Sequence, residues 1–331
     1  MSYRDSMLNG IAAAKRYHQV HSVETNIEPA GGRINIFQAI INEGAPLLFR
    51  PLQGLLGAYI LDEEQNRGIL ISTQRRLPIQ RFTGAHELGH LLLGHSPSLD
   101  NQETLDGRFR SLPSQEIEAN AFAEEFLSPR WLLKFHAIRQ GWTNSDLINP
   151  TVTYQLSLRL GQSYEATCRT LQSKGLISNN DTAGLLEVSP KSIKQGLLPK
   201  QAYPEQWYGD VWQITEKDHG LLLEGDPDDL FVFRLHEKSS AGYVWDLDQV
   251  RKEGFTVITE DRTYQNDGLV GSGLNLSFVT TNSEVPKCTL SLEHKRPWRT
   301  ENPSISELIL NFQLYGKEKG LPRIQRPNLV A

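Results

Sequence analysis

The pattern of apolar and polar positions changes near residue 205. Before that point, apolar residues recur at helical spacing in five segments: 6–20, 114–127, 131–139, 156–160 and 164–173. Strand-like apolar runs accompany them at 46–51, 55–61 and 68–72, and 34–41 fits a helix or a strand. After it, apolar residues occupy alternate positions at 221–223, 231–235, 243–247, 274–278, 290–292 and 308–314. The pattern predicts an α+β first part followed by an all-β, antiparallel, immunoglobulin-like sandwich.

Polar stretches mark the expected domain boundaries. Residues 178–203 are rich in Asn, Ser, Pro, Gly and Lys, which predicts a loose linker. We therefore expect four units: an α+β domain at 1–141, a helical segment at 142–180, a linker at 181–205 and the sandwich at 206–331.

The helical segment has the outline of a helix-turn-helix motif, since two short helices flank 161–163. DNA contact is one interpretation, and a packing element that braces the first domain is the other. The nearby basic residues are only Arg159, Arg169 and Lys174. Duplex binding normally needs a clear basic surface, so direct DNA binding is not expected.

Composition narrows the class of protein. The chain has 331 residues, a net charge of −5 and 38% hydrophobic residues, which is ordinary for a soluble globular protein. No apolar run approaches the roughly 20 residues of a membrane span. The N-terminal stretch lacks the apolar core of a signal peptide, and the two cysteines fit no metal or disulfide framework. We therefore expect a cytoplasmic protein without membrane contact.

The strongest chemical motif is His86-Glu87-Leu88-Gly89-His90, an H-E-x-x-H pattern inside a predicted helix that starts with Thr83 as its N-cap and stops at Gly94. His86 and His90 are one helical turn apart and face the same way. Two imidazoles on one face supply half of a tetrahedral zinc site. The residue between them, Glu87, is placed to act as a general base, so the motif predicts a zinc-dependent peptidase.

The third metal ligand must come from elsewhere in the chain. A metzincin would continue with glycine and histidine three and six positions after His90, but this chain has Leu93 and Ser96 there. His95 is one position short, and its ordinary interpretation is a histidine at a helix end. A carboxylate from a second helix, the gluzincin-like arrangement, is the alternative.

The predicted helix at 114–127 offers two such carboxylates. Glu116 shares a face with small residues and with Asn120, which is placed to accept a hydrogen bond from the second nitrogen of a ligand histidine. Glu118 shares a face with Phe122 and Phe126, which suggests core packing. We favour Glu116 as the third ligand, with Glu118 as the alternative.

Two motifs together carry a family resemblance. Phe82-Thr-Gly-Ala-His-Glu-Leu-Gly-His90 and Glu116-Ile-Glu-Ala-Asn-Ala-Phe-Ala-Glu-Glu-Phe-Leu-Ser-Pro129 resemble those of the ImmA/IrrE family of metallopeptidases. The resemblance implies a zincin core followed by a helix-turn-helix-like segment. It also implies one Zn²⁺ per chain and cleavage of a helix-turn-helix transcriptional repressor inside the cell, with roles in stress response and transcription regulation.

The proposed chemistry needs a group that stabilises the oxyanion formed when water attacks a peptide carbonyl. Tyr154, Arg75 and Arg76 have suitable donors. Their ordinary interpretation is a core residue and two surface residues, so the sequence does not identify this donor.

Three predicted loops of the sandwich share glycine, aromatic and basic residues suited to binding a protein. Their candidate contact residues are Ser240, Gly242, Tyr243, Gly271, Gly273, Arg296, Pro297 and Trp298. Trp245 fits the sandwich core better than the surface.

These loops resemble those of chagasin-like inhibitors of papain-type cysteine proteases. The likeness lies in Gly242-Tyr243-Val244-Trp245, the glycine-rich loop and Arg296-Pro297-Trp298, whereas Lys238-Ser-Ser-Ala241 replaces the family's Asn-Pro-Thr-Thr. The resemblance implies a protein partner at the sandwich, either a cysteine protease or another protein. A cysteine-protease inhibitor or binding module on a zinc-binding scaffold is thus the alternative function. Recruitment of a substrate and restraint of the zinc site are further roles open to this domain.

Overall fold

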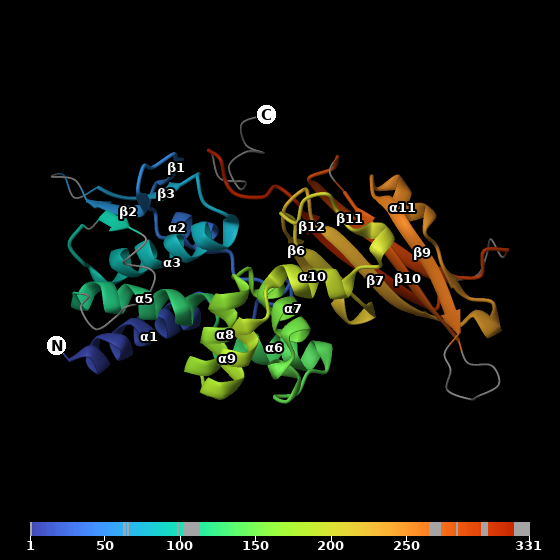
Figure 1. Cartoon of the computed structure of the whole chain (residues 1–331). Helices are drawn as coiled ribbons and strands as arrows, with labels where there is room; N and C mark the ends of the chain where they lie inside the picture. Colours follow the sequence, from blue (N-terminus) through green and yellow to red (C-terminus); the bar gives the residue numbers. More distant parts are fainter. Residues whose placement is uncertain are drawn as a thin grey trace.

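The computed structural model describes residues 2–61, 64, 66–97, 99–101, 113–264, 273–282, 284–298 and 304–320. Figure 1 shows a helical part with a small sheet at one end of the molecule and a β-rich part at the other. No helix within the described ranges is long and apolar enough to cross a membrane.

The first part is a four-stranded sheet covered by helices. The strands are β1 (Leu47–Arg50), β2 (Leu55–Leu61), β3 (Arg67–Ser72) and β4 (Leu99–Asn101), in the order β1-β3-β2-β4, with β1 parallel to β3 and the other pairs antiparallel. The helices are α1 (Tyr3–Val20), α2 (Ile36–Asn42), α3 (Leu77–Leu93) and α5 (Ser114–Leu127). α3 packs between the sheet and α5, and α1 packs on α5. The helix predicted at 114–127 is confirmed.

The start of α3 differs from the prediction. Thr83 was expected as the N-cap, but the helix begins at Leu77 and Pro78 lies in its first turn. Proline fits the first helical turn because its fixed φ is helical and its missing N–H has no intrahelical partner there. The predicted stop at Gly94 is confirmed, with φ of 68° in the left-handed region. His86 therefore lies well inside the helix, where its position is firmly held.

The second correction concerns the expected linker. The helices that follow α5 are α6 (Arg130–Gln140), α7 (Pro150–Leu160), α8 (Tyr164–Ser173), α9 (Asn179–Glu187) and α10 (Pro190–Leu197), with short 3-10 turns at Asp146–Ile148 and Lys200–Ala202. The stretch 178–203 is thus largely helical. Its Ser and Pro residues begin helices: Ser178 makes a capping box with Asp181, and Ser189 caps a helix that starts with Pro190. The helix-turn-helix outline of α7 and α8 remains a prediction.

The second part contains two four-stranded sheets, β5-β7-β10-β9 and β6-β12-β11-β8. Their strands are β5 (Val211–Ile214), β6 (Leu222–Glu224), β7 (Leu230–Glu237), β8 (Val244–Trp245), β9 (Thr256–Tyr264), β10 (Leu274–Thr281), β11 (Lys287–Lys295) and β12 (Ser306–Gln313). Short helical elements lie at Glu216–Asp218, Ser239–Ala241 and α11 (Asp248–Lys252).

The sheets are mixed, so the expectation of a wholly antiparallel sandwich was wrong. β5 runs parallel to β7, and β6 runs parallel to β12. Strand β9 escaped prediction because most of its side chains are exposed, which leaves no apolar alternation to read. The immunoglobulin-like topology remains a prediction.

Buried ion pairs join the two parts. Glu224 on β6 accepts hydrogen bonds of 2.9 Å from both Arg33 and Arg81, and these three side chains are at most 10% exposed. On α7, Arg159 pairs with Asp218 of the second part at 2.6 Å. α7 is buried along 153–160, consistent with a packing role between the two parts. Figure 1 shows the sandwich beyond α7 and α10, on the opposite side of these helices from α5.

Candidate metal centre

Close packing of α3 against α5 sets up the site. Gly89, between the two histidines of the motif, faces α5, where a Cβ would lie 3.2 Å from the Cα of Ala119 and 3.1 Å from the ring of Phe122. The small residues Gly89 and Ala119 thus let the two backbones approach. This closeness allows side chains of α5 to reach His86 and His90.

His86, His90 and Glu116 converge on one point in the buried space between these helices. The Nε2 atoms of His86 and His90 are 3.0 Å apart, and Glu116 Oε2 lies 3.2 Å from the first and 3.5 Å from the second. Tetrahedral zinc with ligand bonds of about 2.0–2.1 Å separates its ligand atoms by about 3.3 Å. The three atoms therefore fit the ligand spacing of a zinc ion, and two imidazoles with one carboxylate are a ligand set that zinc accepts.

The carboxylate of Glu116 is held in the ionised form that a metal ligand needs. Burial by itself would raise its pKa, but hydrogen bonds with His86 and His90, together with their charges, outweigh burial and hold the pKa of Glu116 well below its usual value. On the outer side of His86, Asn120 Oδ1 lies 3.0 Å from Nδ1. An acceptor there fixes the tautomer that leaves Nε2 free for a metal.

The candidate base, Glu87, follows His86 directly in the chain and is completely buried. Gly57 of β2 leaves room for the Glu87 side chain, because a Cβ at this position would lie 2.8 Å from Glu87 Oε1 and 2.3 Å from Thr83. Gly57 is therefore part of the site, although in the sequence it looked like an ordinary strand glycine. Only the pairing of α3 with β2 shows its role.

Glu118, the alternative ligand, takes different partners. Its Oε2 accepts a hydrogen bond of 2.8 Å from Asn9 of α1 and lies 3.1 Å from His95 Nε2. The Nδ1 atom of His95 is in turn 2.9 Å from His90 Nδ1. The structure thus brings Glu116, not Glu118, to His86 and His90. Sequence reasoning set His95 aside as a histidine at a helix end, and it did not consider Asn9.

The candidates for oxyanion stabilisation lie elsewhere. Tyr154 donates to Asp210 at 2.9 Å and accepts from the amide of Val211 at 3.0 Å, so it bridges α7 and the sandwich. Arg76 donates to the carbonyl of Tyr208 at 2.9 Å, which directs it to the segment before β5. Tyr154 is therefore committed to the interface between the two parts.

Comparison with known families agrees with this division. Residues 42–172 match the family model of the IrrE N-terminal-like domain, peptidase family M78. Residues 226–312 match that of the chagasin family peptidase inhibitor I42. The first part is IrrE-like, and the second is chagasin-like. Both resemblances read from the sequence are confirmed.

Two solved structures are similar to the chain. One is the cysteine protease inhibitor EhICP2 from Entamoeba histolytica, with 21% identity, a TM-score of 0.28, and coverage of 31% of this chain and 95% of that chain. The other is amebosin, with 20% identity, a TM-score of 0.25, and coverage of 31% of this chain and 96% of that chain. No curated protein matches the chain.

In the chagasin-like part, two of the three candidate loops meet. Arg296 donates to the carbonyl of Ala241 at 2.9 Å and stacks over the ring of Tyr243 at 4.5 Å. The ring of Trp298 covers Gly242, where a Cβ would lie 2.5 Å from it, yet Trp298 is 66% exposed. Together Tyr243, Arg296 and Trp298 form an aromatic and basic patch.

The other loop candidates divide between surface and support. Ser240 and Pro297 are exposed beside this patch. Gly273 is buried, and a Cβ there would lie 2.2 Å from the carbonyl of Glu237, so it serves close strand packing. Gly271 lies outside the described residues. Trp245 is 3% exposed and belongs to the core.

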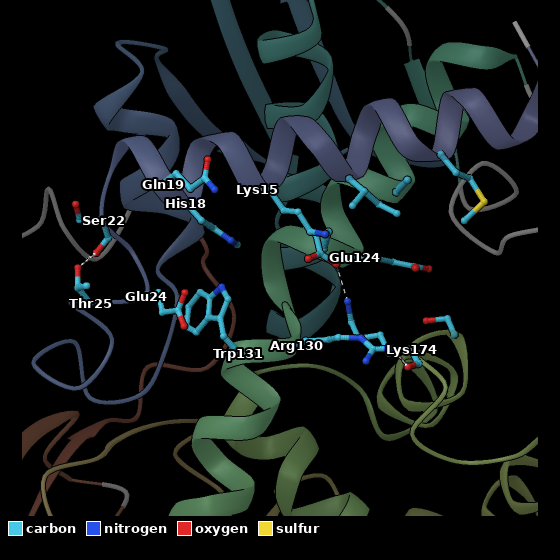
Figure 2. Close-up of a pocket in the computed structure, with 15 residues that line it drawn as sticks. Lys15, His18, Gln19, Ser22, Glu24, Thr25, Glu124, Arg130, Trp131 and Lys174 are labelled. Atoms are coloured by element: carbon cyan, nitrogen blue, oxygen red, sulfur yellow. Dashed lines mark hydrogen bonds and ion pairs between the residues drawn. The ribbon is translucent and has the colours of Figure 1, made fainter.

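A cavity of about 710 Å³ opens on the other face of α5, separate from the candidate metal centre. It lies between α1, α5, the start of α6 and the end of α8, and Figure 2 shows His18, Glu124, Trp131 and Lys174 around it. Burial lowers the pKa of His18 to about 4, so its imidazole is neutral at pH 7. The Lys174 ammonium is engaged by Glu125 at 2.7 Å.

Proposed function

We propose that the protein is a zinc-dependent endopeptidase that hydrolyses a peptide bond of a protein substrate. The observation that carries the proposal is the convergence of His86, His90 and Glu116, whose ligand atoms all lie within 4.8 Å of one another next to buried Glu87. Structural zinc sites close all four positions with protein ligands, whereas catalytic sites keep one open. Three protein ligands beside a carboxylate base are the arrangement of a catalytic site.

The residues divide the chemistry between them. A zinc ion held by His86, His90 and Glu116 would supply Lewis acidity that polarises a peptide carbonyl and makes water more acidic. Glu87 takes the proton from the attacking water and delivers it to the nitrogen of the leaving amine.

The resemblance to the IrrE family suggests the substrate class, a helix-turn-helix transcriptional repressor, and the chagasin-like part is then a binding module for a partner. The described contacts of this part with α3 lie in the first turns of that helix, at Gln80 and Arg81, rather than at the H-E-x-x-H motif, which favours recruitment over a lid on the metal centre. The proposal places the protein in transcriptional regulation.

The test pairs metal analysis with one substitution. Glu87→Gln should retain one zinc per chain and lose at least roughly 100-fold in cleavage rate on purified helix-turn-helix repressors, because only the proton-transfer group is removed. Glu165→Gln changes an exposed glutamate on α8; it is the matched control and should cleave normally. Zinc-free protein from zinc-replete cells, or full activity of Glu87→Gln, would sink the proposal.

A second candidate function, inhibition of a cysteine protease, is supported by the exposed patch around Trp298. If it holds, the full chain slows papain, and Trp298→Ala weakens inhibition at least tenfold because exposed tryptophans often dominate binding energy. The matched control is Tyr264→Ala, which truncates an exposed aromatic side chain on β9 of the same part. No inhibition of papain or of related proteases by the full chain would remove this candidate.

A further inference from the structure

A chain of polar contacts runs from His90 to α1 on the side away from the ligand cluster. His90 Nδ1 lies 2.9 Å from His95 Nδ1, His95 Nε2 lies 3.1 Å from Glu118 Oε2, and Asn9 Nδ2 donates to the same oxygen at 2.8 Å. The side chains of His95 and Glu118 are 10% and 8% exposed, so water competes little for these contacts. Three separate segments of the chain supply the series.

Hydrogen positions along this series follow from one assumption, that His90 binds the metal through Nε2. Its Nδ1 must then carry the proton and donate, so the Nδ1 of His95 accepts. The neutral His95 ring therefore carries its proton on Nε2 and donates it to the Glu118 carboxylate. Every donor meets an acceptor, and Asn9 completes the series with a further donor.

The backbone is arranged to make this series possible. Gly94 turns the chain in the left-handed region, and the amide of His95 donates to the carbonyl of His90 at 3.0 Å, which folds residue 95 back under the helix end. On the other side, Gly10 lets α1 approach α5, since a Cβ there would lie 2.1 Å from the carbonyl of Glu118. Asn9 reaches Glu118 because of that approach.

We propose that His95 and Glu118 are positioning residues that orient His90 and raise its basicity as a metal ligand. The inference rests on the proposed zinc site and goes beyond it, because it gives both residues a role that their sequence positions did not suggest. Carboxylates commonly orient metal-bound histidines directly, and removing such partners costs about 10–100-fold in metal affinity. Here a second imidazole stands between the carboxylate and the ligand.

The test measures zinc affinity by competition with a chelator, together with the visible spectrum of the Co²⁺-loaded protein. His95→Phe keeps a ring without nitrogens and should weaken zinc binding about 10–100-fold. His95→Gln offers both an acceptor and a donor and should recover part of that loss. Glu118→Gln should weaken binding by a smaller factor and shift the Co²⁺ spectrum, and it carries the test if His95→Phe fails to fold.

Glu124→Gln is the matched control: it makes the same change on the other face of α5 and should stay within twofold of the wild type. Zinc affinity of His95→Phe and Glu118→Gln within twofold of the wild type would overturn the inference. The measurement needs no substrate, so its failure is distinct from that of the proposed function, in which zinc binds as expected but no peptide bond is cleaved. A wild-type chain that binds no zinc would overturn both.

Discussion

At the scale of single residues, Glu116 and Glu118 show how two positions on one helix take different roles. Residues two apart on an α-helix point about 200° away from each other. Glu116 therefore faces His86 and His90, while Glu118 faces α1 and His95. The sequence favours Glu116 as the third ligand only because small residues and Asn120 share its face of the helix.

A buried histidine gives the fold a pH dependence. Burial, and then the charge of Arg159, lower the pKa of His136 from 6.5 to about 3, and its Nε2 donates to the carbonyl of Gly32 at 2.9 Å. The unfolded chain binds a proton at this residue below about pH 6.5, whereas the folded chain stays neutral until about pH 3. The contribution of His136 to stability is therefore fully present above pH 6.5 and is lost as the pH falls toward 3.

We expect the free energy of unfolding to fall between pH 6.5 and pH 4, with up to about 1.4 kcal/mol per pH unit from His136. His136→Gln keeps a donor for Gly32 and should flatten the profile by that amount. Urea titrations at several pH values measure both slopes. Buried His18 contributes a slope of the same sign to both proteins, so the difference between the two profiles reports His136 alone. Parallel profiles would contradict the role of His136 in the pH dependence.

At the scale of elements, the two halves of α3 have different roles. Its later half carries His86 and His90, and its earlier half is tied to the chagasin-like part. Gln80 accepts from the amide of Glu318 at 2.7 Å and donates to the carbonyl of the same residue at 2.9 Å. The next residue, Arg81, pairs with Glu224. The helix that carries His86 and His90 is thus held by the second part.

Glu224→Gln tests how much this contact between the two parts contributes to the free energy of unfolding. It leaves two buried guanidinium groups without their shared carboxylate, so we expect the free energy of unfolding to fall by roughly 3–5 kcal/mol. Glu165→Gln breaks an ion pair with Arg169 that is more than 60% exposed on each side, and should change it by less than about 0.5 kcal/mol. Chemical denaturation of both variants gives the comparison. A small effect of Glu224→Gln would mean that the two parts are only loosely joined.

At the scale of the whole molecule, the two parts form one body. Their boundary contains buried charges and hydrogen bonds that neither part satisfies alone, and Figure 1 shows the segment after β12 running from the sandwich back toward the helices of the first part. Groups left unsatisfied by separation would each cost free energy. We therefore expect the parts to unfold together.

Zinc should then protect the distant sandwich. Binding to the folded state alone adds about 2.7 kcal/mol when free zinc is 100 times its dissociation constant. If the parts unfold together, slowly exchanging amides of β11 and β12 gain the same protection as those of α5. Hydrogen exchange with mass spectrometry, with and without zinc, measures this gain. Protection confined to the IrrE-like part would show two independent units.

The sequence by itself determined the helices at 114–127 and around His86, the first three strands, the change to a β-rich part, and the candidate ligand pair with its candidate base. These features depend on local periodicity and on the spacing of residues within one helix, which the chain encodes directly. The pattern placed the start of α3 too late, predicted a linker where helices form, and predicted antiparallel strands where the sheets are mixed. These features depend on packing partners, which local periodicity does not encode.

The tertiary structure alone decided which glutamate faces the histidines, where His95 folds back, why Gly57 must be small and how Glu224 ties the parts together. Each of these contacts joins segments far apart in the chain, and the approach of two such segments is set by the packing of the whole molecule. The H-E-x-x-H pattern predicts the chemistry, and the packing around α3 brings Glu116 to the two histidines of that pattern.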